Sequence, residues 1–247
     1  MMKQKWLISA ACFLSAHAFA DGLSNNPVVN GQKVITLSAG PAWYSSGSTQ
    51  TVTLQPDVLK TYIGDSETRV LGTAEIFFGI QCLLTNQIYS QFGIAAAYAG
   101  NAKLRGDVLE DGDPNFNNFV YRYQLNHGRV GLKGKLLGDF GYWVTPYLSG
   151  SVAVAFNHSF DWSLTPKIFE EVPAPPFASN TTTAFAYTVG AGLQAPLNKH
   201  WQLGLGYEFA DLGKSQLAAA IGQSVNDRFK ETHLYTHQLQ FSATYLL

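Results

Sequence analysis

The chain has 247 residues, and its 16 lysines and arginines nearly balance 17 aspartates and glutamates, which leaves a formal net charge of −1 and no electrostatic basis for nucleic-acid binding. Charged residues are 13% of the sequence, about half of the usual share for a soluble domain, while hydrophobic residues are 46%. No uninterrupted apolar run approaches the roughly 18 residues that a membrane-spanning helix needs. This combination is typical of membrane-spanning strands, whose apolar residues are dispersed at a period of two.

The amino terminus predicts an export signal over residues 1–20. Lys3 and Lys5 form a basic start, an apolar stretch follows, and a small-x-small cleavage pattern ends at Ala20. Residues 21–32 then form a leader, which we expect to lie in the periplasm.

Beyond the leader, apolar and polar residues alternate as they do in strands that have one face of each kind. Eight segments show this pattern, and they cover residues 33–44, 69–81, 87–99, 119–136, 143–156, 183–195, 200–210 and 232–247. In the fourth segment the apolar parity changes near His127 and Gly128, so we predict a β-bulge there.

The last segment, from Thr232 to Leu247, has the most informative pattern. One of its faces is largely apolar, and the middle of the other carries only neutral hydrogen-bonding residues from Thr236 to Thr244. A strand face in bulk water usually carries charges, so this face favours a crowded, hydrated barrel lumen. The alternative is a half-buried edge strand of a soluble β-sandwich.

The connections between the segments alternate between long and short along the chain. The long connections are polar and cover residues 45–68, 100–118, 157–182 and 211–231. Outer-membrane barrels have this alternation, with short periplasmic turns, long extracellular loops and an even number of strands. A soluble barrel of the lipocalin kind has no reason to place four long loops at one end.

The chain resembles the small outer-membrane barrels of the OmpA, OmpX and opacity-protein kind over residues 33–247. The resemblance is carried by the signal end at Ala20, the hairpin of residues 191–203 and the alternating last strand. It implies an all-β fold, an eight-stranded antiparallel transmembrane β-barrel in the outer membrane of a Gram-negative-type bacterium. It also implies contact with outer-membrane lipid and lipopolysaccharide, and recognition of the last strand by the barrel-assembly machinery. Such families usually end in Phe or Trp, whereas the final aromatic residue here is Tyr245.

Aromatic residues near the strand ends predict two girdles at the water–lipid interfaces. The predicted girdle residues are Trp43, Tyr98, Tyr121, Phe209 and Tyr235 beside the long loops, and Tyr89, Trp143, Trp201 and Tyr245 beside the short turns or the terminus. The alternative is that aromatic residues are simply frequent in strands.

Charged residues on the polar faces predict an ion-pair lattice in the lumen. The residues are Glu75, Glu208, Arg129 and Lys133, the last two on the assumption of the predicted bulge. Unpaired charges in an enclosed lumen are costly, so we expect them to pair and to stiffen a narrow barrel. The functional alternative is a gated conductance pathway, although a barrel of this size is just wide enough to fill with side chains.

A catalytic interpretation rests on His158 and Ser159, with Asp161 close by. Some outer-membrane barrels modify lipids with a His and a Ser on one strand face, but adjacent strand residues point to opposite faces. We interpret Cys82, the one cysteine after the signal segment, as a small residue near a turn. No group of Cys and His residues in the sequence has the spacing of metal ligands. We therefore expect no metal and no cofactor.

The sequence favours a non-catalytic role at the cell surface, either in envelope integrity or in adhesion through the long loops. Loops on a rigid scaffold commonly carry recognition, so a host or surface ligand is the expected partner there. A narrow or gated channel for small solutes is the alternative, and lipid-modifying catalysis comes third.

Overall fold

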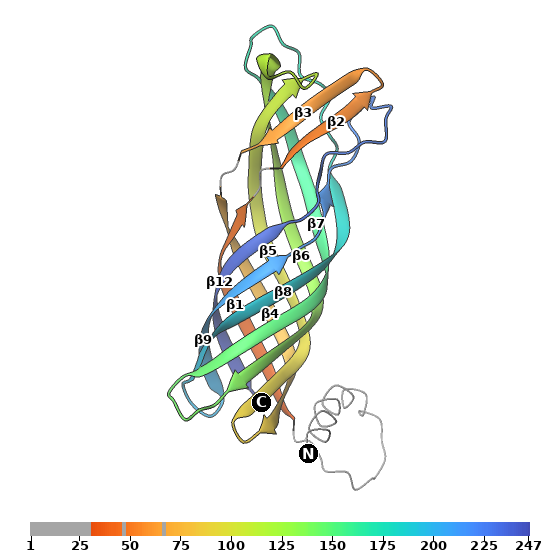
Figure 1. Cartoon of the computed structure of the whole chain (residues 1–247). Helices are drawn as coiled ribbons and strands as arrows, with labels where there is room; N and C mark the ends of the chain where they lie inside the picture. Colours follow the sequence, from red (N-terminus) through yellow and green to blue (C-terminus); the bar gives the residue numbers. More distant parts are fainter. Residues whose placement is uncertain (1–30, 46–47, 66–67) are drawn as a thin grey trace, which may run out of the picture.

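A computed structural model describes residues 31–45, 48–65 and 68–247. The predicted signal peptide and nearly all of the predicted leader lie outside the described residues. Within the described ranges, no helix is long and apolar enough to cross a bilayer. The strands form a long, strongly twisted cylinder, with the carboxyl terminus at the end that carries the short turns (Figure 1).

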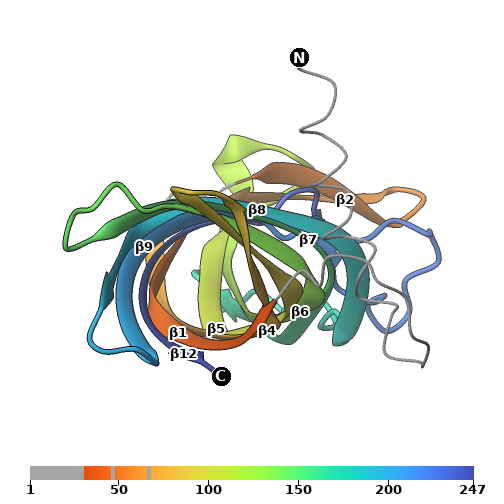
Figure 2. The same ribbon diagram turned by 90° about the horizontal axis from the view of Figure 1, so that it is seen from below.

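The wall of this cylinder is a closed antiparallel ring, seen end-on in Figure 2. In the described part of the chain, the eight wall strands are β1 (Gln32–Ser45), β4 (Thr68–Thr85), β5 (Ile88–Glu110), β6 (Asn117–Gly138), β7 (Thr145–Pro166), β8 (Asn180–Pro196), β9 (Trp201–Asp211) and β12 (Tyr235–Leu246). The ring closes because β12 pairs with β1, from Val34 opposite Leu246 to Tyr44 opposite Thr236. The predicted antiparallel barrel is confirmed.

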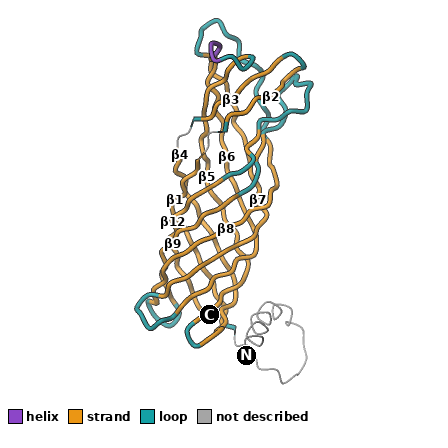
Figure 3. The backbone as a smooth tube through the Cα atoms, viewed as in Figure 1, coloured by secondary structure: helices purple, strands orange, loops and turns teal. Residues whose placement is uncertain are grey.

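The wall strands differ in length, and this difference divides the molecule. β5 has 23 residues and β6 and β7 have 22 each, whereas β9 has 11. The three long strands continue well beyond the others at the long-loop end (Figure 3). Much of what the sequence predicted as loop in residues 100–118 and 157–182 is therefore strand. The prediction was wrong there because one face of the extension is polar.

The first predicted long loop also contains regular structure. It forms a hairpin of β2 (Thr49–Gln55) and β3 (Val58–Gly64), and β3 pairs with β5 from Lys60 opposite Glu110 to Gly64 opposite Gly106. A single 3-10 turn, η2 (Pro114–Phe116), and the two-residue strands β10 (Ser215–Gln216) and β11 (Lys230–Glu231) complete this end. We call residues 48–65, 101–126, 158–179 and 212–234 the dome, and the remaining described residues the barrel.

The bulge predicted near His127 is wrong, because the alternation along β6 is unbroken from Phe119 to Leu137. Odd-numbered residues from Phe119 to Leu137 face inward throughout; they are apolar in the dome and include three cations in the barrel. The irregularities nearest to His127 lie in the neighbouring strands, between Ala99 and Ala102 in β5 and beside Asp161 in β7. The apolar parity changes along β6 because the composition of the interior changes, not because the strand slips.

Candidate functional site

Four charged side chains cross the lumen of the barrel and bind one another. The Nη2 atom of Arg129 lies 2.5 Å from Oε1 of Glu208 and 3.1 Å from Oε2 of Glu75. Lys133 Nζ lies 2.7 Å from Oε2 of Glu208 and also contacts Oε1 of Glu75. These are the residues from which the sequence predicted a lattice, and they come from β4, β6 and β9, on different sides of the ring. We call them the charge quartet.

The alternation of β6 explains how the charge quartet forms. Arg129 and Lys133 are four residues apart, so both point inward from one strand and can share the same two carboxylates. None of the four residues is more than 6% exposed, and their formal charges cancel. Gln240 donates a hydrogen bond of 3.3 Å to Glu208. Buried charges that are paired and hydrogen-bonded in this way form a rigid crossbar.

The space beside the charge quartet is filled almost completely. A cavity of about 20 Å³, lined in part by Lys133 and Tyr147, has room for about one water molecule. Lys135 extends over the Tyr147 ring, with Nζ 4.2 Å from the ring centroid, and donates a 3.1 Å hydrogen bond to Gln194. The ion pairs and these side chains occupy most of the barrel interior at this level.

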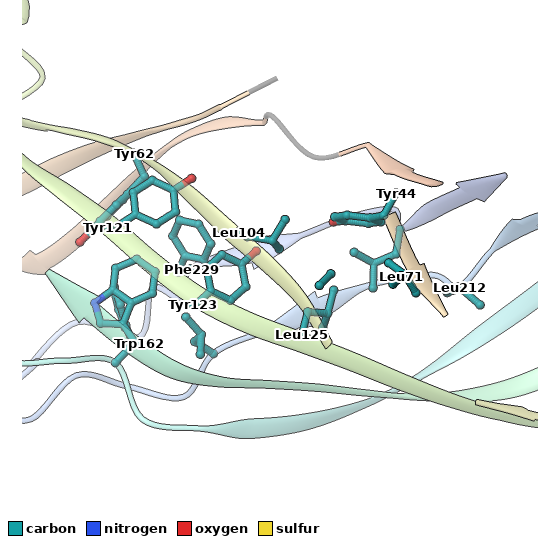
Figure 4. Close-up of a cluster of buried hydrophobic side chains, with 14 of the residues drawn as sticks. Tyr44, Tyr62, Leu71, Leu104, Tyr121, Tyr123, Leu125, Trp162, Leu212 and Phe229 are labelled. Atoms are coloured by element: carbon teal, nitrogen blue, oxygen red, sulfur yellow. The ribbon is translucent and has the colours of Figure 1, made fainter. Parts of the chain in front are cut away.

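The dome has an interior of the opposite kind, an aromatic core that the sequence pattern did not predict (Figure 4). The rings of Tyr121 and Trp162 are nearly parallel, and their centroids are 5.2 Å apart. The centroid of the Phe229 ring lies 5.1 Å from that of Trp162 and 5.2 Å from that of Tyr62. The core also contains Tyr123 and Phe177, and all of these side chains are buried. Tyr121 and Tyr123 lie in the predicted fourth strand, whereas the other members lie singly in segments predicted as long polar loops.

Burial of Tyr62 within this aromatic core has an electrostatic consequence. Burial, followed by the nearby charge of Glu110, raises the pKa of Tyr62 above its ordinary value. The phenol therefore stays neutral at physiological pH, as a packed aromatic core requires.

Most of the predicted girdle residues lie on the outer side of the wall or in an adjoining turn. At the long-loop end they are Trp43, Tyr98, Phe209 and Tyr235, and at the short-turn end they are Trp143, Trp201 and Tyr245. Phe209 and Tyr235 stack at 5.7 Å, and Trp201 and Tyr245 contact each other at 4.9 Å.

Two girdle predictions are wrong. Tyr121 belongs to the aromatic core of the dome, because the alternation from Phe119 to Leu137 is unbroken and keeps it inward. Tyr89 pairs with the buried residue Leu137 and shares the inward parity of Gln91 in β5, so it lies on the lumen side at the short-turn end.

His158 and Ser159 do not form a nucleophile–base pair. His158 Nδ1 lies 2.9 Å from the Thr181 hydroxyl on the outer side, whereas the Ser159 hydroxyl is buried and lies 2.6 Å from the Ser215 hydroxyl. Asp161 accepts a hydrogen bond from Gln124. Cys82 is buried in β4, and the described residues contain no group of three or more His, Cys, Asp or Glu residues that could hold a metal ion.

The distal tip of the dome exposes apolar side chains. Phe169 is fully exposed, and Phe116, Ile168 and Val172 are also exposed. The tip is nevertheless braced, because Asn118 donates a 2.9 Å hydrogen bond to Glu171 and the backbone amide of Lys167 donates to the carbonyl of Asn118. These four apolar residues are the distal patch.

Residues 7–245 match the outer membrane protein β-barrel domain family. Among solved structures, OprG of Pseudomonas aeruginosa is similar, with a TM-score of 0.52 and 13% identity over 87% of this chain and 96% of that chain. Neisserial surface protein A has a TM-score of 0.47 and 12% identity over 87% and 97% of the two chains. The outer membrane protease OmpT of Escherichia coli has a TM-score of 0.45 and 7% identity over 91% and 99%. No curated protein sequence matches the chain.

Proposed function

The chain belongs to the outer membrane protein β-barrel domain family, and from this premise we propose that it is a closed outer-membrane barrel whose dome binds partners outside the cell. In such barrels the short turns face the periplasm and the long loops face outward. The dome would therefore stand above the outer leaflet, and the charge quartet would lie within the membrane.

The observation that carries this proposal is closure of the interior at two separate levels. The charge quartet ties β4, β6 and β9 together across the barrel, and the aromatic core fills the dome above it. A solute would have to break four ion contacts and then displace packed rings. This arrangement favours a mechanical and surface role over conduction.

The distal patch supports an interaction role for the dome. Exposed apolar groups on a braced surface are typical of sites that contact other macromolecules. Phe116 and Phe169 come from two different connections that hydrogen bonds hold together, so the patch is presented in a defined shape. The opposite directions of His158 and Ser159 support a non-catalytic role.

Planar-bilayer recording of the refolded full chain tests closure. We expect insertion without discrete conductance steps, because the charge quartet and the side chains beside it occupy most of the lumen. Discrete channels whose conductance changes in Glu75→Gln or Glu208→Gln would overturn the proposal in favour of a gated channel.

Retention of expressing cells on octyl-coated glass tests the distal patch. Phe116→Ser combined with Phe169→Ser should lower retention several-fold relative to wild type. Phe140→Ser with Trp143→Ser is the matched control, because these exposed residues lie in the turn between β6 and β7 at the opposite end. Equal retention of the patch variant and the wild type would contradict the surface role.

A further inference from the structure

A basic groove lies on the outer face of the molecule where the dome joins the barrel. Its volume is about 470 Å³, and its basic lining residues are Arg69, Lys103, Arg105 and Arg122. These are four of the 16 basic residues of the chain and include three of its five arginines. Such a concentration in a nearly neutral protein indicates a site for an anion.

The strand register makes this concentration of positive charge destabilising for the folded chain when no anion is bound. Arg105 and Arg122 are directly opposite each other in the β5–β6 ladder, where like charges destabilise a sheet. Arg105 pairs with Asp65 at 2.9 Å, and Asp161 also lines the groove. Among the described residues, Lys103, Arg105 and Arg122 with these two carboxylates leave an excess of one positive charge.

Two of the cations have no carboxylate partner in the part of the chain that the structure describes. Within residues 31–45, 48–65 and 68–247, neither Lys103 nor Arg122 makes an ion pair. Asp161, which lines the groove, accepts a hydrogen bond of 2.5 Å from Gln124. An incoming anion could therefore bind Lys103 and Arg122, which make no ion pair among the described residues, beside Arg105, which makes one.

The height of the basic groove relates it to the membrane surface. The outward residues of β5 are apolar from Phe92 to Tyr98 and then become Asn101, Lys103 and Arg105. At about 3.3 Å per residue and a tilt of about 40°, Lys103 stands roughly 10 Å above Tyr98. This is the level of lipid headgroups rather than of acyl chains.

A second groove, which is apolar, lies directly below on the same strands. Its volume is about 490 Å³, its floor includes Ala96 and Gly128, and its sides include Tyr98, Val130 and Phe156. Small residues between large ones leave a hollow on the lipid-facing wall. The two grooves together match a molecule with an acyl chain below and anionic groups above.

We propose that the two grooves form one binding site for a phosphorylated glycolipid of the outer leaflet. The acyl chain lies in the apolar groove, and headgroup phosphates bind Lys103, Arg105 and Arg122. The planar guanidinium forks of the two arginines can each donate two hydrogen bonds to one phosphate. The bound phosphate also relieves the repulsion between Arg105 and Arg122. This lipid site goes beyond the proposed surface role, because it uses the junction and not the distal patch.

The test is equilibrium binding by the full chain refolded in a non-ionic detergent. The probes are bis-phosphorylated lipid A, the same lipid with its phosphates removed, and water-soluble glucosamine 1-phosphate. Wild type should bind the phosphorylated lipid at least about tenfold more tightly than the dephosphorylated one, since each charged hydrogen bond is worth about a factor of ten. Glucosamine 1-phosphate should not compete at concentrations equal to those of the lipid.

Variants locate the two parts of the site. Lys103→Gln with Arg122→Gln should weaken binding of the phosphorylated lipid about tenfold and leave the dephosphorylated lipid unaffected. Lys199→Gln with Lys214→Gln removes the same charge from exposed positions elsewhere and should change neither. Ala96→Phe fills the apolar groove and should weaken both lipids alike.

Some outcomes would overturn the inference. Wild-type affinity in the Lys103/Arg122 variant, with unchanged heat-dependent mobility on gels as proof of folding, would show that the basic groove does not bind the phosphates. Competition by glucosamine 1-phosphate as strong as that of the lipid would assign the basic groove to a soluble ligand. Loss of the distal patch leaves this assay unaffected, so failure of the proposed surface role and failure of the lipid site are distinguishable.

Discussion

Strand β6 passes through both parts of the molecule and keeps the same face inward in each. In the barrel, its inward residues include Arg129 and Lys133, and Val130 between them is exposed. In the dome, Tyr121 and Tyr123 are inward and Arg122 is outward. One strand with one unbroken alternation therefore carries opposite patterns of polarity.

The surrounding solvent explains this reversal. Outward side chains of a membrane barrel meet hydrocarbon, so apolar residues lie outside and polar residues are confined to the lumen. The dome projects beyond the apolar belt into water, where burial of apolar surface is favourable. It therefore has an apolar interior and a polar outer face, as a soluble β domain has. The barrel thus depends on polar contacts inside, and the dome depends on ring packing.

The largest expected effect comes from removing one acid of the charge quartet. Glu208→Ala leaves Arg129 and Lys133 with Glu75 alone, and a broken buried ion pair costs about 3–5 kcal/mol. Urea unfolding of the barrel in lipid vesicles measures the loss. Glu170→Gln, at an exposed position, serves as the control and should change little. A loss below about 1 kcal/mol in Glu208→Ala would mean that the quartet does not support the barrel.

A smaller effect, confined to the dome, follows from Phe229→Ala. Phe229 comes from the connection between β9 and β12 and contacts the rings of Tyr62, Tyr121, Tyr123 and Trp162. We expect a loss of about 3 kcal/mol, because a buried ring is replaced by a cavity. Trypsin should then cleave this connection faster, while the barrel keeps its folded mobility on gels. Ile221→Ala, in the same connection but exposed, should not accelerate cleavage.

Close packing against the glycines of β9 gives an intermediate effect in the barrel. A Cβ atom at Gly206 would lie 2.0 Å from the Tyr147 hydroxyl, so Gly206→Ala should cost about 1–3 kcal/mol by overpacking. Because the hydroxyl is the nearest atom, Tyr147→Phe should restore part of this loss in the double variant. Gly72→Ala meets no atom within 4 Å and is the neutral control. Equal unfolding midpoints for Gly206→Ala and Gly72→Ala would contradict the predicted clash.

The smallest effect is the pH dependence of the dome. Burial raises the pKa of Glu231 above its ordinary value, and the hydrogen bond from Ser48 opposes this shift. A raised carboxyl pKa favours folding below the ordinary pKa of glutamate, and this contribution is lost as pH rises through the raised value. Glu231→Gln should therefore slow tryptic cleavage of the dome at pH 7 relative to wild type, by less than about 1 kcal/mol in opening free energy.

Ser48→Ala provides the opposite test for Glu231. It removes the hydrogen bond that lowers the pKa, so the pH dependence of dome cleavage between pH 4 and 7 should become steeper. A variant with a flatter pH profile than wild type would mean that another group sets this dependence.

Much of the barrel follows from local pattern in the sequence. Alternation at period two assigns each side chain of a strand to one face, so the amino-acid sequence alone predicts the wall strands and the inward direction of Glu75 and Glu208. The lumen is narrow, and four inward charges of both signs must pair in it, so a lattice is expected as well. These inferences need only neighbouring residues and the dimensions of a small barrel.

The dome does not follow in this way, because its contacts join distant segments. Tyr62 and Trp162 are 100 residues apart along the chain and Trp162 and Phe229 are 67 apart, and local composition gives no sign that their rings meet. The change of parity at His127 resembles a bulge because the sequence does not say where hydrocarbon ends and water begins. The sequence by itself determined which side chains share a face, whereas the tertiary structure decided which medium each face meets, because only the assembled barrel defines an inside and an outside.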